Sequence, residues 1–127
     1  YLSIIYENDV WNQRVVKMLK GVMEATQRYP TSFGVWADML QKVVTGVNEL
    51  VVTGKNSHNL LKEILHIFIP HKILQVSAYS DEKYPLLRGK DFTGKPLVFL
   101  CKDYACQAPA ADVDSLTMLL GNNHKFS

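Results

Sequence analysis

The stretch Glu49–Gly54, which reads ELVVTG, decides the fold predicted for this chain. Its β-branched residues indicate a short strand, and the glycine marks the end of that strand. Asn56 and Ser57 can then cap a helix, in which apolar residues recur at helical spacing until Pro70. A second strand-like run, Lys72–Ser77, follows directly. A strand, a helix and a strand joined by short loops predict a βαβ unit with a parallel strand pair.

The segment after this unit predicts a third strand and a last helix. Leu97–Cys101 is an apolar run that follows a loop rich in proline and glycine. Asp112 or Asp114 can cap a helix that runs through Leu120 and ends at Gly121. These two acids are helix caps in our interpretation, and not a general acid/base pair. We expect an α/β fold, a small three-layer unit with about three mostly parallel strands.

The first 45 residues have helical spacing instead. Apolar residues within Trp11–Tyr29 form one stripe, and Asn8 or Asp9 can cap that helix. A second helix follows, with Thr31 or Ser32 as its cap. We therefore divide the chain into residues 1–45 and 46–127. We expect the two N-terminal helices to pack on one face of the sheet unit, and the alternative is that a partner segment covers that face.

Length and composition limit the class of protein. A chain of 127 residues with 47 % apolar and 20 % charged residues has an ordinary globular balance. The net charge of +2, without a basic block, argues against nucleic-acid binding. The sequence has no run as long as a membrane span and no secretory signal pattern, so we expect a cytoplasmic location and no membrane partner. A start at Tyr1, within helical spacing, suggests a piece of a longer protein.

Both cysteines, Cys101 and Cys106, stand at the end of the third predicted strand. Their spacing differs from the Cys-x-x-Cys of thioredoxin-like sites, which leaves buried thiols, a local disulfide or a reactive thiol as alternatives. An extended chain would separate their Cα atoms by roughly 16 Å, and a bridge needs less than about 7 Å. No glycine or proline lies between them, although Asp103 tolerates turns. We therefore expect two free thiols with a structural role in preference to a redox one, and Cys106 as the more exposed of the two.

A candidate anion site lies at the strand-to-helix turn formed by Gly54, Asn56 and Ser57. Doubly wound folds bind ligands at the carboxyl ends of strands, and a helix N-terminus favours anions. The phosphate-loop and dinucleotide-binding patterns are both incomplete, however. The alternative that we favour is a turn that needs the conformational freedom of glycine.

Catalytic and metal-binding patterns are missing from the sequence. It offers no nucleophile–base pair, no Gly-x-Ser-x-Gly and no His-Glu-x-x-His. The histidines show no ligand spacing with the cysteines: they are His58, His66, His71 and His124. We therefore predict no catalytic residue, no metal and no cofactor for this chain alone.

Several stretches together resemble one family. In order along the chain they are Tyr29–Pro30, Phe33–Leu40, Glu49–Gly54, Ile69–Leu74, Pro85–Lys90, Gly94–Cys101 and Cys106–Pro109. Their order and spacing are similar to the C-terminal end of large thioredoxin-domain-containing proteins, the relatives of spermatogenesis-associated proteins. Those proteins carry an N-terminal thioredoxin-like domain and a helical body similar to six-hairpin glycosidases and N-acylglucosamine epimerases. The resemblance implies that residues 1–45 are the last helices of that body and that residues 46–127 are its C-terminal α/β module.

Three functions follow as expectations from this resemblance. The first is a non-catalytic structural or interaction module whose partner is the rest of its parent protein. The second is part of a sugar-related enzyme body, in which Trp36 or Asp38 lines a cleft. The third is a redox accessory, in which Cys101 and Cys106 exchange with the thioredoxin-like domain.

Overall fold

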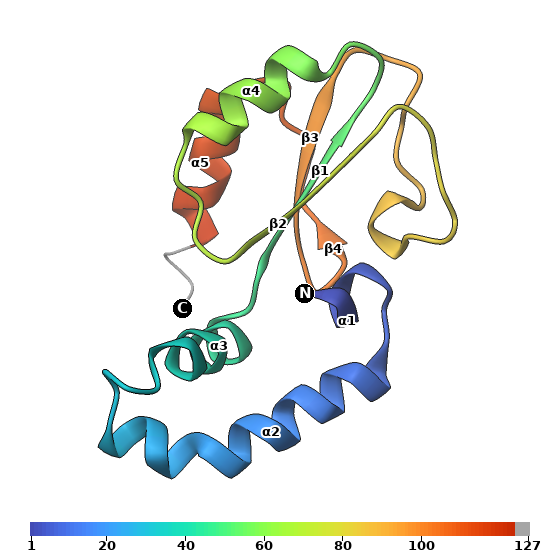
Figure 1. Ribbon diagram of the computed structural model, residues 1–127. Coiled ribbons are helices and arrows are strands. Elements are labelled where there is room, and N and C mark those ends of the chain that lie inside the picture. Colours follow the sequence, from blue (N-terminus) through green and yellow to red (C-terminus); the bar gives the residue numbers. More distant parts are fainter. Residues whose placement is uncertain (124–127) are drawn as a thin grey trace. The chain divides into compact units, whose positions relative to one another are not determined.

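The computed structural model describes residues 1–123, which divide into two compact units (Figure 1). The first unit is Tyr1–Val47, and the second begins at Asn48. The division predicted from the sequence, after residue 45, lies close to this boundary. His124, one of the four histidines considered above, lies outside the described residues.

The first unit is helical. It contains α1 (Leu2–Ile5), α2 (Asp9–Arg28) and α3 (Gly34–Thr45). The predicted Asn8 cap of α2 is confirmed, because Asn8 Oδ1 accepts a hydrogen bond of 3.0 Å from the Trp11 N–H. The Trp11 ring also meets Tyr6 edge-on, with 6.1 Å between the ring centroids.

The predicted cap of α3 is wrong. Phe33 is the N-cap residue, and no described side chain caps this helix. The backbone N–H groups of Ser32 and Phe33 instead donate to the Tyr29 carbonyl oxygen, so the turn between the two helices satisfies them locally. Gly46 ends α3 with a φ of 82°, and its N–H donates to the Lys42 carbonyl oxygen.

The second unit confirms the βαβ prediction. β1 (Asn48–Thr53) pairs in parallel with β2 (Lys72–Ser77), and α4 (His58–His66) connects them. Ser57, one of the two predicted capping residues, is the N-cap residue of α4, but its side chain makes no cap hydrogen bond within the described chain. Asn56 has a φ of 60° and belongs to the turn before the helix.

The prediction of mostly parallel strands is wrong. β3 (Leu97–Lys102) runs antiparallel to β1, and β4 (Ala105–Cys106) runs antiparallel to β3. The sheet is therefore mixed and four-stranded, in the order β2-β1-β3-β4. A connection between parallel strands must carry the chain back to the end of the sheet where the first strand began, usually through a helix. Residues 78–96 contain only the short 3₁₀ helix η1 (Pro85–Leu87), and they enter β3 at the sheet end where β2 stops.

One face of the sheet packs against helices. The predicted last helix is α5 (Val113–Asn123), and it extends two residues past Gly121. Asp112 caps it, since Asp112 Oδ1 accepts a hydrogen bond of 2.8 Å from the Ser115 N–H. Figure 1 shows α4 and α5 side by side over this face, which we call the helix face. Its buried core is apolar and comprises Leu50, Val52, Leu60, Ile64, Ile69, Val98, Leu100, Ala110 and Leu116.

The other face is covered by the segment 78–96, and we call it the loop face (Figure 1). Successive side chains of a strand point to opposite faces, so Glu49, Val51 and Thr53 lie on the loop face when Leu50 and Val52 lie on the helix face. Leu86, Leu87 and Phe92 from the covering segment are buried. The loop face thus combines apolar cover with polar strand residues.

Candidate functional site

The two cysteines form a disulfide, so the expectation of two free thiols is wrong. Cys101 on β3 and Cys106 on β4 are directly opposite each other, and their Cα atoms lie 3.9 Å apart. Cys101 is only 1 % exposed, whereas Cys106 is exposed, as expected. The bridge therefore joins a buried sulfur to a residue at the surface.

A two-residue turn brings the cysteines together. Asp103 and Tyr104 have φ values of 50° and 64°, so both adopt the left-handed conformation that a type I′ two-residue turn requires. Asparagine, aspartate and glycine usually fill such positions, and a tyrosine there is uncommon. The prediction failed because it gave more weight to the absence of glycine and proline than to the tolerance of Asp103 for turns, and this chain makes the reversal with Asp103 and Tyr104.

Glu49 lies beside this disulfide. It is directly opposite Cys101 in the β1–β3 pair, on the loop face, and only 2 % exposed. Its Oε2 accepts a hydrogen bond of 3.0 Å from the Tyr104 N–H, which ties the carboxyl group to the hairpin turn. Burial raises the pKa of Glu49, an effect that the Tyr104 hydrogen bond opposes and the Asp103 charge reinforces. The site therefore holds a disulfide and a buried carboxyl group on neighbouring strands.

Lys90 reaches the same face from the covering segment. Its ammonium nitrogen lies 5.4 Å from the centroid of the Phe99 ring on β3. Burial lowers the pKa of Lys90, while the attraction of Glu49 acts in the opposite direction. The loop face thus carries charges of both signs close to the bridge.

Two further polar atoms on this face are buried without a hydrogen-bond partner among the described residues. They are Thr53 Oγ1 and Gln75 Oε1. Gln75 on β2 is opposite Val51, two residues before Thr53 on β1, so both side chains belong to the loop face. An unpaired buried polar group costs free energy, which sets this face apart from the apolar helix face.

Gly54 occupies the predicted strand-to-helix turn, with a φ of 96°. A Cβ atom there would lie 3.1 Å from both Lys95 O and Pro96 Cα, so the position requires glycine for its conformation and for its space. The interpretation as a glycine turn is confirmed. Asn56 is exposed and Ser57 is half-buried beside it, and an anion site formed by these residues stays a prediction.

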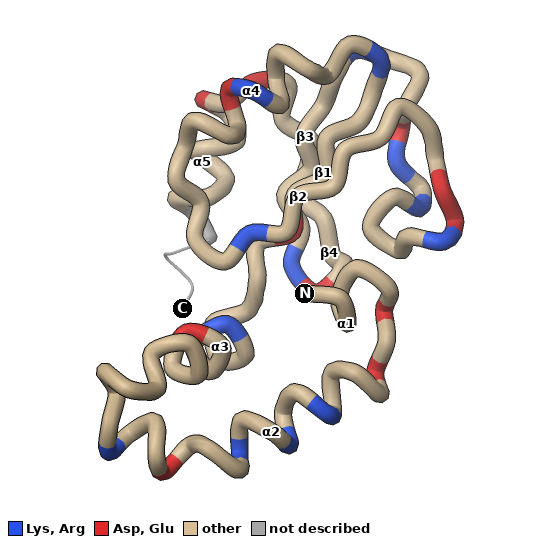
Figure 2. Tube along the Cα trace, viewed as in Figure 1, with Lys and Arg blue, Asp and Glu red and all other residues tan. Residues whose placement is uncertain are grey.

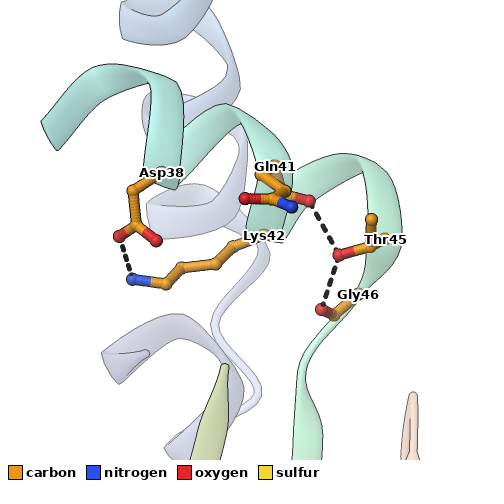
Figure 3. Close-up of polar contacts among 5 residues, drawn as sticks. All are labelled: Asp38, Gln41, Lys42, Thr45 and Gly46. Atoms are coloured by element: carbon orange, nitrogen blue, oxygen red, sulfur yellow. Dashed lines mark hydrogen bonds and ion pairs between the residues drawn. The ribbon is translucent and has the colours of Figure 1, made fainter. Parts of the chain in front are cut away.

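The predicted cleft residues lie on α3. Asp38 is exposed and forms an ion pair with Lys42 one helical turn later (Figure 3). Trp36 is half-buried. Lys42 also lies 5.1 Å from the centroid of the Tyr1 ring, and the Asp38 contact raises the pKa of Lys42. A shallow depression elsewhere, on α2, is lined by Asn12, Gln13, Val16, Lys17 and Lys20. A sugar cleft at Trp36 and Asp38 stays a prediction.

Other kinds of site leave no trace in the described residues. No three His, Cys, Asp or Glu side chains within residues 1–123 gather as a metal site requires. None of the described helices is both long and apolar enough to cross a membrane. Figure 2 shows charges of both signs spread along both units.

Comparisons of the chain with protein families, with curated proteins and with solved structures each find no match. The resemblance to thioredoxin-domain-containing proteins therefore stays a proposal.

The sequence interpretation missed Glu49 as a site residue. It placed Glu49 at the start of the first strand and gave it no role. A signal was present, because an acid that directly precedes a buried apolar run lies next to the core. Its position beside Cys101 could not be predicted, because it depends on the register between two strands that lie far apart in the sequence.

Proposed function

We propose that this chain is a redox accessory module that exchanges its Cys101–Cys106 disulfide with the dithiol of a partner. The observation that carries the proposal is the asymmetry of the bridge: Cys106 is exposed, while Cys101 is buried beside a carboxyl group. Exchange needs an accessible sulfur for the incoming thiolate. Of the two cysteines, Cys106 is the exposed residue and lies on a short edge strand, so it is the one that a partner can approach.

The exchange transfers two electrons from the partner dithiol to the bridge of this chain in two steps. A partner thiolate attacks Cys106 Sγ, the bond between Cys101 and Cys106 breaks, and its electron pair stays on Cys101 Sγ. The second thiol of the partner then displaces Cys106, so the partner is oxidised to a disulfide and this chain is reduced to two thiols. A thioredoxin-like domain of a parent protein is the partner class that we propose. We also propose a cytoplasmic location, where disulfides in most organisms are transient and catalytic or redox-sensing.

The test is to incubate the native, oxidised chain with a thioredoxin-like dithiol protein and to count alkylated cysteines by mass spectrometry. Both thiols of this chain should become alkylated without denaturant. In a second experiment, the Cys106 thiol of the Cys101→Ser protein is activated, and a partner variant with a single cysteine should then be trapped on Cys106 as a mixed disulfide. A bridge that reacts only after unfolding would contradict the proposal. An exposed serine change, Ser80→Ala, is the matched control and should react like the native chain.

A second candidate function is a structural module that packs against further helices of a parent protein. It is favoured by the exposed apolar residues of the first unit, such as Val35 and Val44 on α3, which are 73 % and 76 % exposed. Helices that expose this much apolar surface commonly pack against another surface. Amide hydrogen exchange in α2 and α3 should slow when the chain is part of its longer protein. Equal exchange in both contexts would count against this function.

A further inference from the structure

We propose that Glu49 is the proton donor and acceptor for the Cys101 sulfur during exchange. This inference rests on the proposed redox function and adds a residue that reacts with the bridge. It arises from one row of residues across three strands, Glu49 on β1, Cys101 on β3 and Cys106 on β4.

The geometry places these three side chains on one face. Glu49 and Cys101 are direct partners in the β1–β3 pair, and Cys101 and Cys106 are direct partners in the β3–β4 pair. Directly opposite residues on antiparallel strands point to the same face, with Cβ atoms about 4.5–5.5 Å apart. Side chains at such positions are neighbours, which places the Glu49 carboxyl group beside the bridge.

The chemistry requires a proton at this place. When an incoming thiolate bonds to Cys106 Sγ, the electron pair of the broken bond leaves on Cys101 Sγ, which is buried. A buried thiolate next to a carboxylate is strongly disfavoured, whereas a protonated Glu49 can give its proton to the sulfur. The products are then a Cys101 thiol, a Glu49 carboxylate and the mixed disulfide on Cys106. In the oxidising direction the carboxylate takes the proton back.

The groups around Glu49 suit this role. From the hairpin turn, the Tyr104 N–H donates to Glu49 Oε2 and the Asp103 carboxylate repels its charge. From the covering segment, Lys90 attracts that charge, and β2 contributes the uncharged Ile73 opposite Glu49. Burial is the largest influence and raises the pKa of Glu49, so the proton stays bound to a higher pH than on an exposed glutamate.

The test measures how fast dithiothreitol reduces the native bridge across a pH series that begins at the ordinary glutamate value of 4.5 and extends upward, because the pKa of Glu49 is raised. Samples are quenched with acid, alkylated and counted by mass spectrometry, and each rate constant is divided by the thiolate fraction of the reagent. The corrected rate constant of the native chain should rise as the pH falls through the pKa of Glu49, by about tenfold or more. In Glu49→Gln this rise should disappear. Glu63→Gln, which removes an exposed carboxyl group on α4, should keep the native profile.

A folded Glu49→Gln protein with the native profile would overturn the proton role and leave the exchange itself standing. A native bridge that dithiothreitol does not reduce at any pH would overturn the exchange, and the proton role with it. If Glu49→Gln does not fold, the carboxyl ¹³C resonance of Glu49 in the native chain decides. Its pKa should fall on reduction, because the Cys101 thiol then donates a hydrogen bond to the carboxylate. An unchanged pKa would overturn the proton role.

Discussion

β1 has two faces, and they differ in chemistry. On the helix face, Leu50 and Val52 are completely buried among apolar side chains from α4, α5 and β3. On the loop face, the same strand presents Glu49 and Thr53, equally buried, under a segment without an α-helix. One strand thus supplies a packed core on one side and buried polar groups on the other. The difference indicates that the helix face provides stability, while the loop face retains groups that cost stability and hold the candidate chemistry.

The largest effect should come from the helix face. Leu116 on α5 is completely buried in that core, so Leu116→Ala should lower the free energy of unfolding by about 2–5 kcal/mol, through lost burial and a residual cavity. Denaturant unfolding measures this change. The exposed Met118→Ala on the same helix is the control and should change little. A loss below about 1 kcal/mol for Leu116→Ala would contradict the view that packing on the helix face provides most of the stability.

A smaller loss of stability is expected from a substitution at Gly54, in the turn where the covering segment approaches the end of β1. Gly54→Val should lower the free energy of unfolding by about 1–3 kcal/mol, because a β-branched residue resists the φ of 96°. The added Cβ would also press on Lys95 and Pro96, which lead into β3. Gly21→Ala, where a Cβ meets nothing within 4 Å, is the control. An unchanged melting temperature for Gly54→Val would mean that the turn tolerates side chains.

The pH dependence of stability should distinguish the faces next. The pKa of Glu49 is raised in the folded chain, so the folded state holds this proton more tightly than the unfolded state. The stability from this group is fully present below the ordinary value of 4.5 and is lost as the pH rises through the folded pKa. The loss is about 1.4 kcal/mol for each unit by which the pKa is raised.

Unfolding free energies of the native chain and of Glu49→Gln, measured across this pH range, provide the test. The native chain should lose stability relative to the variant as the pH increases. The hydrogen bond from Ser115 lowers the pKa of Asp112, so the stability from Asp112 is lost as the pH falls below its ordinary value of 3.8. This pH effect lies below the range in which Glu49 is tested. Parallel curves for the two proteins would refute the buried-carboxyl interpretation.

The smallest effect should be a gain in stability from a substitution on the loop face. Thr53→Val keeps the shape of the side chain and removes a buried hydroxyl that has no hydrogen-bond partner within the described chain. The free energy of unfolding should rise, by up to about 1 kcal/mol. Val52→Thr places a hydroxyl on the helix face instead and should be destabilising. A loss of stability in Thr53→Val would indicate that the hydroxyl is bonded, for example to a buried water.

Local patterns explain why part of this structure could be predicted. The stripe within Trp11–Tyr29 and the side chain of Asn8 act within a few residues, and α2 with its cap follows them. The β-branched runs likewise predicted β1 and β2. The direction of β3 could not be predicted, because it depends on where residues 78–96 leave the sheet. At the hairpin turn, Asp103 fits the residue preferences on which the sequence argument relied, whereas Tyr104, which also has a positive φ, contradicts them.

The disulfide closes a very small ring, since its cysteines are separated by only five positions. In the chain-entropy description, such a ring restricts the unfolded polypeptide by only about 2 kcal/mol, less than a bridge between distant segments. The bridge therefore constrains only the hairpin at the edge of the sheet. Opening it should release the hairpin tip without dismantling the βαβ unit, which is held by the helix face. If the chain exchanges its bridge as proposed, the βαβ unit should therefore stay folded in both the oxidised and the reduced state.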